Sequence, residues 1–135
     1  MEVQAYLFFE GRCEEAIAFY QSTIGAKVER VMHFKDAPDQ SMIKRENANK
    51  VMHAHLTIGK TAVLASDGHC TGKSNFGGFG LTLQAPSDSE ADRLFTALSD
   101  GGQVGMPMAQ TFFASRFGMV TDRFGVMWMV MTQAG

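Results

Sequence analysis

The sequence predicts an α+β fold built from two copies of a βαβββ module, and three observations lead to this prediction. Two amphipathic helical segments are offset by about 78 residues, judged from their apolar periodicity. Each helical segment is preceded by one strand-like segment and followed by three more. Glycine comes shortly after the last apolar residue of each helix, where it commonly ends helices. Eight strands and two helices indicate two curled, mixed sheets with the helices outside.

The first module is expected to span about residues 1–70. Glu14 and Glu15 lie in the first turn of its helix, residues 13–24, where the helix dipole favours anions, and Gly25 ends it. The apolar face of this helix contains Ala16, Ile17, Phe19, Tyr20 and Ile24. The strands are expected at 3–9, 26–34, 51–58 and 61–67, and 35–50 is expected to be a loop. Gly59 and Lys60 then form the turn of a hairpin.

The second module, about residues 76–135, repeats this order, so that both modules form one domain over residues 1–135. Its helix is expected at 87–99, with Ala91, Leu94, Phe95 and Leu98 on the buried face. Ser87 and Glu90 have the spacing of a capping box, in which each side chain satisfies a free backbone N–H. Strands are expected at 78–84, 103–110, 117–121 and 126–132, with a turn at 122–125.

Composition excludes several classes of protein. The chain has 135 residues, 45% of them hydrophobic and 19% charged, which is enough apolar material for a packed core. The formal net charge of −2 argues against a nucleic-acid-binding protein. No apolar run approaches the roughly 20 residues that span a bilayer, and no secretory signal is visible. Two cysteines cannot form a disulfide framework, so we expect a soluble, cytoplasmic protein that does not bind membranes.

Several segments together resemble the vicinal oxygen chelate superfamily, which includes glyoxalases, bleomycin-resistance proteins and dioxygenases. The segments are residues 14–20 with Gly25 and Ala26, then 53–56, then 110–114, and finally 120–128. The last segment, VTDRFGVMW, is the most specific. Within the superfamily the chain is similar to the PhnB-like branch, also called 3-demethylubiquinone-9 3-methyltransferase-like. The resemblance implies a glyoxalase-like fold and a homodimer.

Metal enzymes of this superfamily place a His or Glu on the inner face of each of four strands, where a divalent cation polarises two vicinal oxygens of the substrate. Carried over by the resemblance, these positions are Ala5, Ala65, Phe79 (or the neighbouring Gly78) and Met129. Alanine has no donor atom, and a thioether suits soft ions better than a divalent Lewis acid. We therefore expect no metal and no other cofactor. The Gly-rich strand-to-helix crossover of nucleotide sites is also missing, which argues against S-adenosylmethionine-dependent methyl transfer.

Strand alternation predicts which side chains line the concave face instead. His53 and His55 alternate with apolar neighbours and are expected to face inward as candidate acid/base groups, or to be ordinary hydrogen-bonded histidines. Asp67 is a candidate to orient one of them. Met127 and Met129 form an adaptable apolar wall suited to an apolar or aromatic ligand, although such a stripe is also typical of a core.

The segment 110–116 mixes aromatic and polar residues and supplies three further candidates for ligand binding. These are Gln110, Phe113 and Arg116. The Arg116 guanidinium is a candidate clamp for a carboxylate or phosphonate, and the alternative is a salt bridge to an acidic residue such as Asp122 or Asp67. Cys70 could be a reactive thiol or a bystander, and a zinc site joining His69 or Cys70 to the two histidines is a weaker alternative.

The sequence leaves three functions open. The favoured one is a protein that binds or sequesters a small apolar or aromatic molecule in a metal-free concave pocket. The second is an enzyme of lyase, isomerase or transferase type that uses His53 or His55 as acid or base with Arg116 holding an anion. The third is a purely structural dimer. Metal-dependent glyoxalase or dioxygenase chemistry is the least favoured, because the four positions lack suitable ligands.

Overall fold

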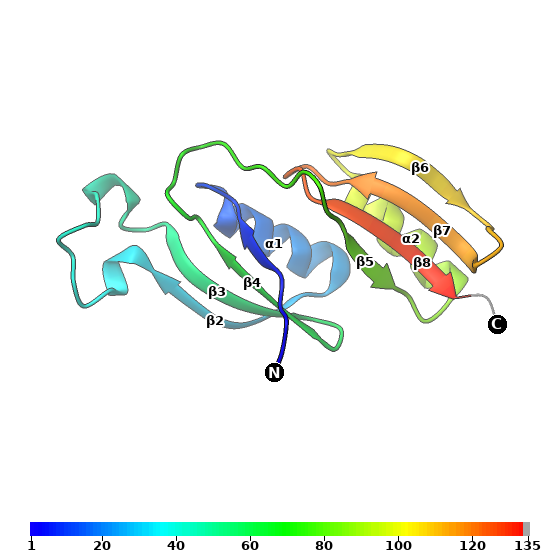
Figure 1. Cartoon of the computed structure of the whole chain (residues 1–135), viewed down its shortest axis with the longest axis horizontal. Coiled ribbons are helices and arrows are strands. Elements are labelled where there is room, and N and C mark those ends of the chain that lie inside the picture. The colour runs from blue at the N-terminus through cyan, green and yellow to red at the C-terminus, as the bar shows by residue number, and fades with distance from the viewer. Residues whose placement is uncertain (134–135) are drawn as a thin grey trace. The chain divides into compact units, whose positions relative to one another are not determined.

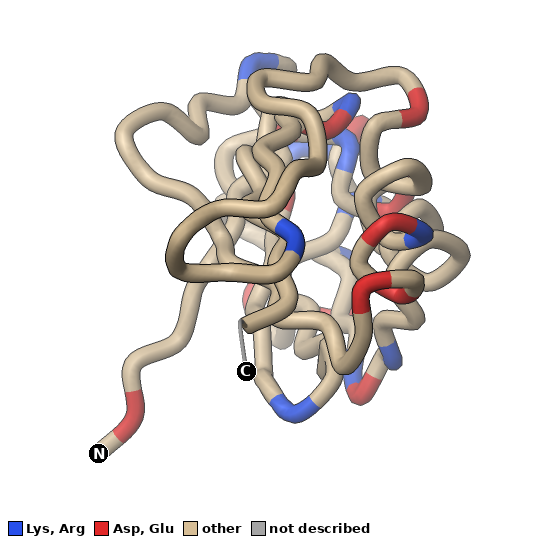
Figure 2. Tube along the Cα trace, turned by 90° about the vertical axis from the view of Figure 1, so that its right-hand side faces the viewer, with Lys and Arg blue, Asp and Glu red and all other residues tan. Residues whose placement is uncertain are grey.

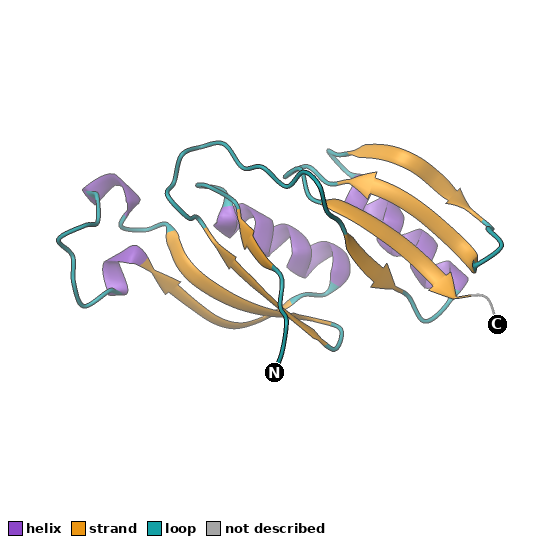
Figure 3. Cartoon of the chain, in the orientation of Figure 1, coloured by secondary structure: helices purple, strands orange, loops and turns teal. Residues whose placement is uncertain are grey.

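The structure is a computed structural model that describes residues 1–133, and it divides into two units, Met1–Ser74 and Asn75–Gly135 (Figure 1). In each unit one α-helix packs on a four-stranded sheet (Figure 3). The strand order is β1-β4-β3-β2 in the first unit and β5-β8-β7-β6 in the second. The predicted α+β fold of repeated βαβββ modules is therefore confirmed, and neither sheet closes on itself.

In the first unit, the elements follow the expected order. They are β1 (Tyr6–Phe8), α1 (Cys13–Ile24), β2 (Lys27–His33), β3 (Val51–Ile58) and β4 (Thr61–Ser66). Strand β1 pairs with β4 in parallel, and the other pairs are antiparallel. The expected first strand, residues 3–9, is longer than β1, and the expected loop contains two short 3₁₀ helices, Phe34–Asp36 and Arg45–Asn47.

The second unit repeats this arrangement. Its elements are β5 (Leu81–Gln84), α2 (Asp88–Ser99), β6 (Gln103–Ala109), β7 (Ala114–Thr121) and β8 (Met127–Gln133). Strand β5 pairs with β8 in parallel, and β6, β7 and β8 pair antiparallel. Strand β7 begins three residues earlier than expected, because Ala114 already pairs with Gln133.

Helix α1 has the predicted apolar face but no local N-cap. All five predicted face residues are buried, together with Cys13. Arg12, at the N-cap position, makes no side-chain cap hydrogen bond. The Asp67 carboxylate, which comes from the end of β4, accepts from the N–H groups of Gly11 and Cys13 at 2.8 Å each. A distant carboxylate therefore takes the place of a local cap. At the other end Gly25 adopts a left-handed conformation, φ 69°, as expected.

Helix α2 has the predicted face and a local cap. Ala91, Leu94, Phe95 and Leu98 are buried. The Ser87 hydroxyl accepts from the Glu90 N–H at 3.2 Å. Of the two bonds of the predicted capping box, only this one forms. The Glu90 carboxylate binds the Arg93 guanidinium instead of the backbone N–H of Ser87. An i, i+3 ion pair on the exposed helix surface thus replaces the reciprocal bond.

Charged residues of both signs are interspersed along the trace (Figure 2). The longest run of basic residues in the described part of the chain is the pair Lys44–Arg45. Over residues 1–133 no helix is both long enough and apolar enough to cross a bilayer.

Candidate functional site

Each sheet has one face under its helix and one open face, and the pattern of burial identifies them. In β3, Ala54 and Leu56 are buried while His53 and His55 are partly exposed. In β8, Trp128 and Val130 are buried while the methionines between them are partly exposed. Because side chains alternate along a strand, the buried residues face the helix and the partly exposed residues lie on the open face. His53, His55, Met127 and Met129 therefore all lie on open faces, as expected.

The first open face combines polar and aromatic side chains. It contains Tyr6, Phe8, Arg30, Met32, His53, His55, Thr57, Leu64 and Ser66. The Tyr6 hydroxyl reaches Nδ1 of His53 at 2.9 Å. If His53 carries its proton on Nε2, the phenol is the donor in this hydrogen bond. Burial raises the pKa of Tyr6, which keeps the phenol protonated at neutral pH.

The Tyr6 ring also stacks on Phe8, with ring centroids 4.8 Å apart and an interplanar angle of 17°. Sequence reasoning did not select Tyr6, although alternation along its strand places it on the open face. The hydrogen bond joins residues 47 positions apart, and no local pattern predicts that contact.

Asp67 does not orient a histidine. Its carboxylate is fully buried and accepts three backbone N–H bonds, two at the start of α1 and one from Val51 at 2.8 Å. Cys13 lies beside it, and burial raises the pKa of the Cys13 thiol, with the Asp67 charge as the next cause. The expected partner of the histidine is therefore corrected from Asp67 to Tyr6. Asp67 instead holds α1 against the sheet.

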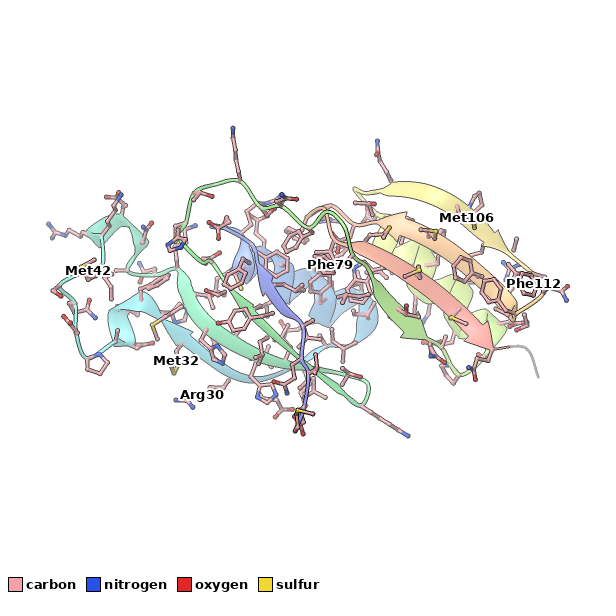
Figure 4. All side chains as sticks on the ribbon, viewed as in Figure 1. Arg30, Met32, Met42, Phe79, Met106 and Phe112 are labelled. Atoms are coloured by element: carbon pink, nitrogen blue, oxygen red, sulfur yellow. The ribbon has the colours of Figure 1, made fainter. Side chains whose placement is uncertain are left out.

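The second open face is dominated by methionine. It contains Thr82, Gln84, Met106, Phe117, Met119, Thr121, Met127, Met129 and Met131. Met106, Met119 and Met129 lie in one row across β6, β7 and β8, because each is the register partner of the next. Figure 4 shows Met106 on β6 at the edge of this sheet. A Cβ atom added to Gly80 would lie 2.9 Å from the terminal methyl of Met127, so glycine leaves room there for the methionine.

The segment that precedes β7 supplies an aromatic cluster to the same face. Phe113 packs edge-to-face against Phe112 at 5.2 Å and Phe117 at 5.1 Å between centroids. Phe112 is 97% exposed and projects from the turn between β6 and β7 (Figure 4). The predicted ligand-binding residue Phe113 thus joins the second open face through Phe117. Gln110 lies exposed in the same turn.

Arg116 is bound to a protein carboxylate. Its Nε and Nη2 donate to Oδ1 of Asp92 on α2 at 2.9 and 2.7 Å. Asp122 and Asp67, the expected alternatives, are not the partners. The guanidinium lies on the helix side of the sheet, because α2 covers that face. This geometry places Arg116 and Met129 on opposite faces and argues against Arg116 as an anion clamp.

The predicted inner-face positions Ala5 and Ala65 are wrong by one residue, because both side chains point to the helix side of the first sheet. Ala65 is the register partner of the buried Ala54 and is 1% exposed, so it lies under α1. Ala5 precedes β1 and lies two residues before the buried Leu7, so both point to the same side of the sheet. The positions on the open face are Tyr6 in β1 and Leu64 or Ser66 in β4.

In the second unit, the position in β8 is Met129 as expected, but Phe79 and Gly78 precede β5, whose open-face residue beside Met129 is Thr82. A thioether suits soft ions better than a divalent Lewis acid, and these positions supply no His, Asp or Glu. Within residues 1–133 no three His, Cys, Asp or Glu residues gather to hold a metal ion.

The fold and the two open faces define the class: tandem βαβββ modules of the glyoxalase-like type. The sequence matches the model of the 3-demethylubiquinone-9 3-methyltransferase family over residues 1–131, and the chain belongs to this family. The resemblance to its PhnB-like members is thereby confirmed. A curated relative is Protein YjdN of Escherichia coli K12, 35% identical over 96% of this chain and 94% of its own.

Solved structures agree with this assignment. Protein PA1353 from Pseudomonas aeruginosa is 40% identical over 98% of both chains, with a TM-score of 0.86. A putative 3-demethylubiquinone-9 3-methyltransferase, PhnB protein, from Bacillus cereus has a TM-score of 0.80 at 23% identity over 98% of this chain and 99% of its own. A glyoxalase/bleomycin resistance protein/dioxygenase family enzyme from Burkholderia phytofirmans, 13% identical over 98% of this chain and 96% of its own, shares the fold with a TM-score of 0.60.

Proposed function

We propose that this protein binds a small apolar or aromatic molecule on the methionine-rich open face of its second unit. The observation that carries the proposal is the presence of five methionines on one face of one sheet, opposite the face that α2 covers. Thioether side chains are flexible and polarizable, and they make favourable contacts with aromatic rings. A wall of this kind adapts to ligands of different shape.

Two further features support a ligand of this chemistry. Phe113 and Phe117 extend the methionine face with aromatic surface. The described side chains of this face carry no Asp, Glu, Lys or Arg, so an uncharged molecule meets no charged group there that it would have to desolvate.

Methyl NMR tests the proposal directly. Protein labelled with ¹³C in the methionine methyl groups is titrated with a set of small aromatic compounds, and single Met→Leu variants assign the signals. We expect ligand-dependent shifts at Met119, Met127 and Met129. Met42, 89% exposed in a loop of the first unit, is the internal control and should not move. Ligands that bind without shifting any of the three signals would refute the proposal.

An enzyme that uses His53 or His55 as acid or base is the second candidate function, and the Tyr6–His53 hydrogen bond favours it. This bond fixes the imidazole ring, as acid/base chemistry requires. Thermal-shift measurements on His53→Ala and His55→Ala separate the two functions. Stabilisation by an aromatic ligand that survives both substitutions supports binding without histidine chemistry. Loss of the ligand's effect in both variants would favour the enzyme.

We also propose that the protein forms a homodimer. The resemblance to the superfamily and the partly exposed apolar sheet faces support this proposal. Sedimentation velocity measures the mass directly. Twice the chain mass of 14.8 kDa at micromolar concentration is the expected result, and a monomer at that concentration would contradict it.

A further inference from the structure

The first open face carries an arginine, Arg30, on its edge strand β2. Within residues 1–133, the Arg30 guanidinium makes no side-chain hydrogen bond and no ion pair. Figure 4 shows Arg30 and Met32 projecting from the same side of β2, which is the edge strand of the sheet. This differs from Arg116, whose guanidinium is bound to Asp92. Arg30 is therefore available to an anion from outside the protein.

The residues around Arg30 leave its positive charge free to bind an anion. Its register partner across the sheet is His55, whose ring also has no partner in the described part of the chain. The adjacent carboxylate, Glu29, accepts from the Thr57 hydroxyl at 3.1 Å and lies 3.8 Å from the Lys27 ammonium. Because Lys27 offsets the charge of Glu29, the guanidinium of Arg30 remains a net positive group on this face.

One row of side chains links this cation to an aromatic surface. Arg30, His55, Leu64 and Tyr6 are successive register partners across β2, β3, β4 and β1. Neighbouring strands are about 4.8 Å apart, so the midpoint between Arg30 and His55 lies about 7 Å from Leu64. That span is longer than benzoate, and it matches an aromatic acid whose ring and anion are separated by a short alkyl linker, with its anion near β2 and β3 and its ring over Leu64, beside Tyr6.

We propose that the first open face is a binding site for a small aromatic oxyanion, a carboxylate or a phosphonate. Arg30 and His55 contact the oxyanion, and Leu64 with the edge of the Tyr6–Phe8 stack contacts the ring. Guanidinium groups bind carboxylate and phosphonate oxygens in a bidentate manner, with stronger bonds than neutral donors make. The site goes beyond the proposed function, since it adds an anion-binding chemistry in residues 1–74 and does not depend on the methionine face.

Calorimetric titration of the 135-residue chain with 2-phenylethylphosphonate and, separately, with 3-phenylpropionate tests the site, and the two arms show which oxyanion it prefers. We expect Arg30→Gln to weaken binding of the preferred probe about tenfold or more, and His55→Gln to weaken it about threefold. Arg45→Gln is the matched control, because it removes the same charge from an exposed position outside the sheet. Its affinity should stay within about twofold of the unmodified chain.

A further pair of titrations separates the ring contact from the anion contact. Tyr6→Ala should weaken 2-phenylethylphosphonate binding and leave inorganic phosphate binding unchanged, since phosphate has no ring. The site is refuted if neither aromatic probe binds at millimolar concentration, or if Arg30→Gln and Arg45→Gln weaken binding equally. These variants change only the first unit, so a negative result leaves the methionine face untested and the two proposals fail separately.

Discussion

The two units share one strand order and differ in the chemistry of their open faces. The first presents Tyr6, Arg30, His53 and His55, whereas the second presents methionine at five positions. Their helix-facing sides are alike, with small and branched apolar residues in both. Packing against a helix restricts the side chains of one face. The other face is under no such restriction, and this is where we place the function of each unit.

The units also stabilise their loops with a buried aspartate in different ways. Asp67 follows β4 and accepts backbone N–H bonds from the start of α1 and from β3. Asp122 follows β7 and accepts from Phe124 and Val126 at 2.9 and 3.1 Å and from the Trp128 indole at 2.9 Å. The first carboxylate joins distant segments, and the second organises a single hairpin.

Removing either buried carboxylate should produce the largest effect. Asp67→Ala leaves three N–H groups without their acceptor, two of them buried, so we expect the free energy of unfolding to fall by about 3 kcal/mol or more. Asp122→Ala should cost a similar amount. Urea denaturation measures both, and Asp100→Ala, which breaks an exposed ion pair with Arg123, is the control at less than about 1 kcal/mol. Equal losses in all three variants would contradict this account.

The tight packing of α2 on its sheet predicts the next effect. A Cβ at Gly118 would lie 2.6 Å from the Met108 sulfur and 2.8 Å from the Phe95 ring. Gly118→Ala should therefore destabilise the protein by about 1–3 kcal/mol. Gly105→Ala is the matched control, because its nearest contacts, at 3.7 and 4.0 Å, are ordinary. Thermal unfolding compares the two variants, and an unchanged midpoint for Gly118→Ala would show that the neighbouring side chains move aside.

The difference between the helix starts predicts a smaller effect. Ser87 caps α2 locally, so Ser87→Ala should cost about 1 kcal/mol, and Ser87→Asp should preserve the stability. Helix α1 has no such cap to lose. Denaturant unfolding of the two variants checks this. Equal stability of Ser87→Ala and the unmodified chain would show that the Ser87 cap does not stabilise α2.

The thiols of Cys13 and Cys70 should differ in their rate of alkylation. Burial raises the pKa of Cys13, and it also raises that of Cys70, which is only partly buried. At pH 8 we expect iodoacetamide to modify Cys70 slowly and Cys13 only after unfolding, as read by mass spectrometry. Modification of Cys13 in the folded chain at the rate of Cys70 would contradict its burial.

The raised pKa of Cys13 also sets the sign of a pH effect. Its contribution to stability is fully present below the ordinary thiol pKa of 9.0, and it is lost as the pH rises toward the folded pKa, because the unfolded chain releases the proton first. Cys13→Ala should flatten the alkaline decrease in unfolding free energy. An unchanged slope between pH 9 and 11 would assign that decrease to other groups.

Local patterns in the sequence were sufficient for the elements and for most of the face assignments. Helix 13–24 and strand 51–58 have the predicted bounds, since apolar periodicity reflects burial directly. The methionine face follows from the same alternation in β8. The error of one residue at Ala5 and Ala65 arose because short apolar strands have two similar faces, and only pairing with Ala54 distinguishes them.

The amino-acid sequence by itself therefore determined the α+β class, the repeated module and the exposed faces of β3 and β8, because these depend on spacing along the chain. The tertiary structure alone decided the partners: Asp67 with the start of α1, Arg116 with Asp92, and Tyr6 with His53. Hydrogen bonds and ion pairs form between whichever groups the fold brings within about 3 Å, and no local pattern encodes that distance.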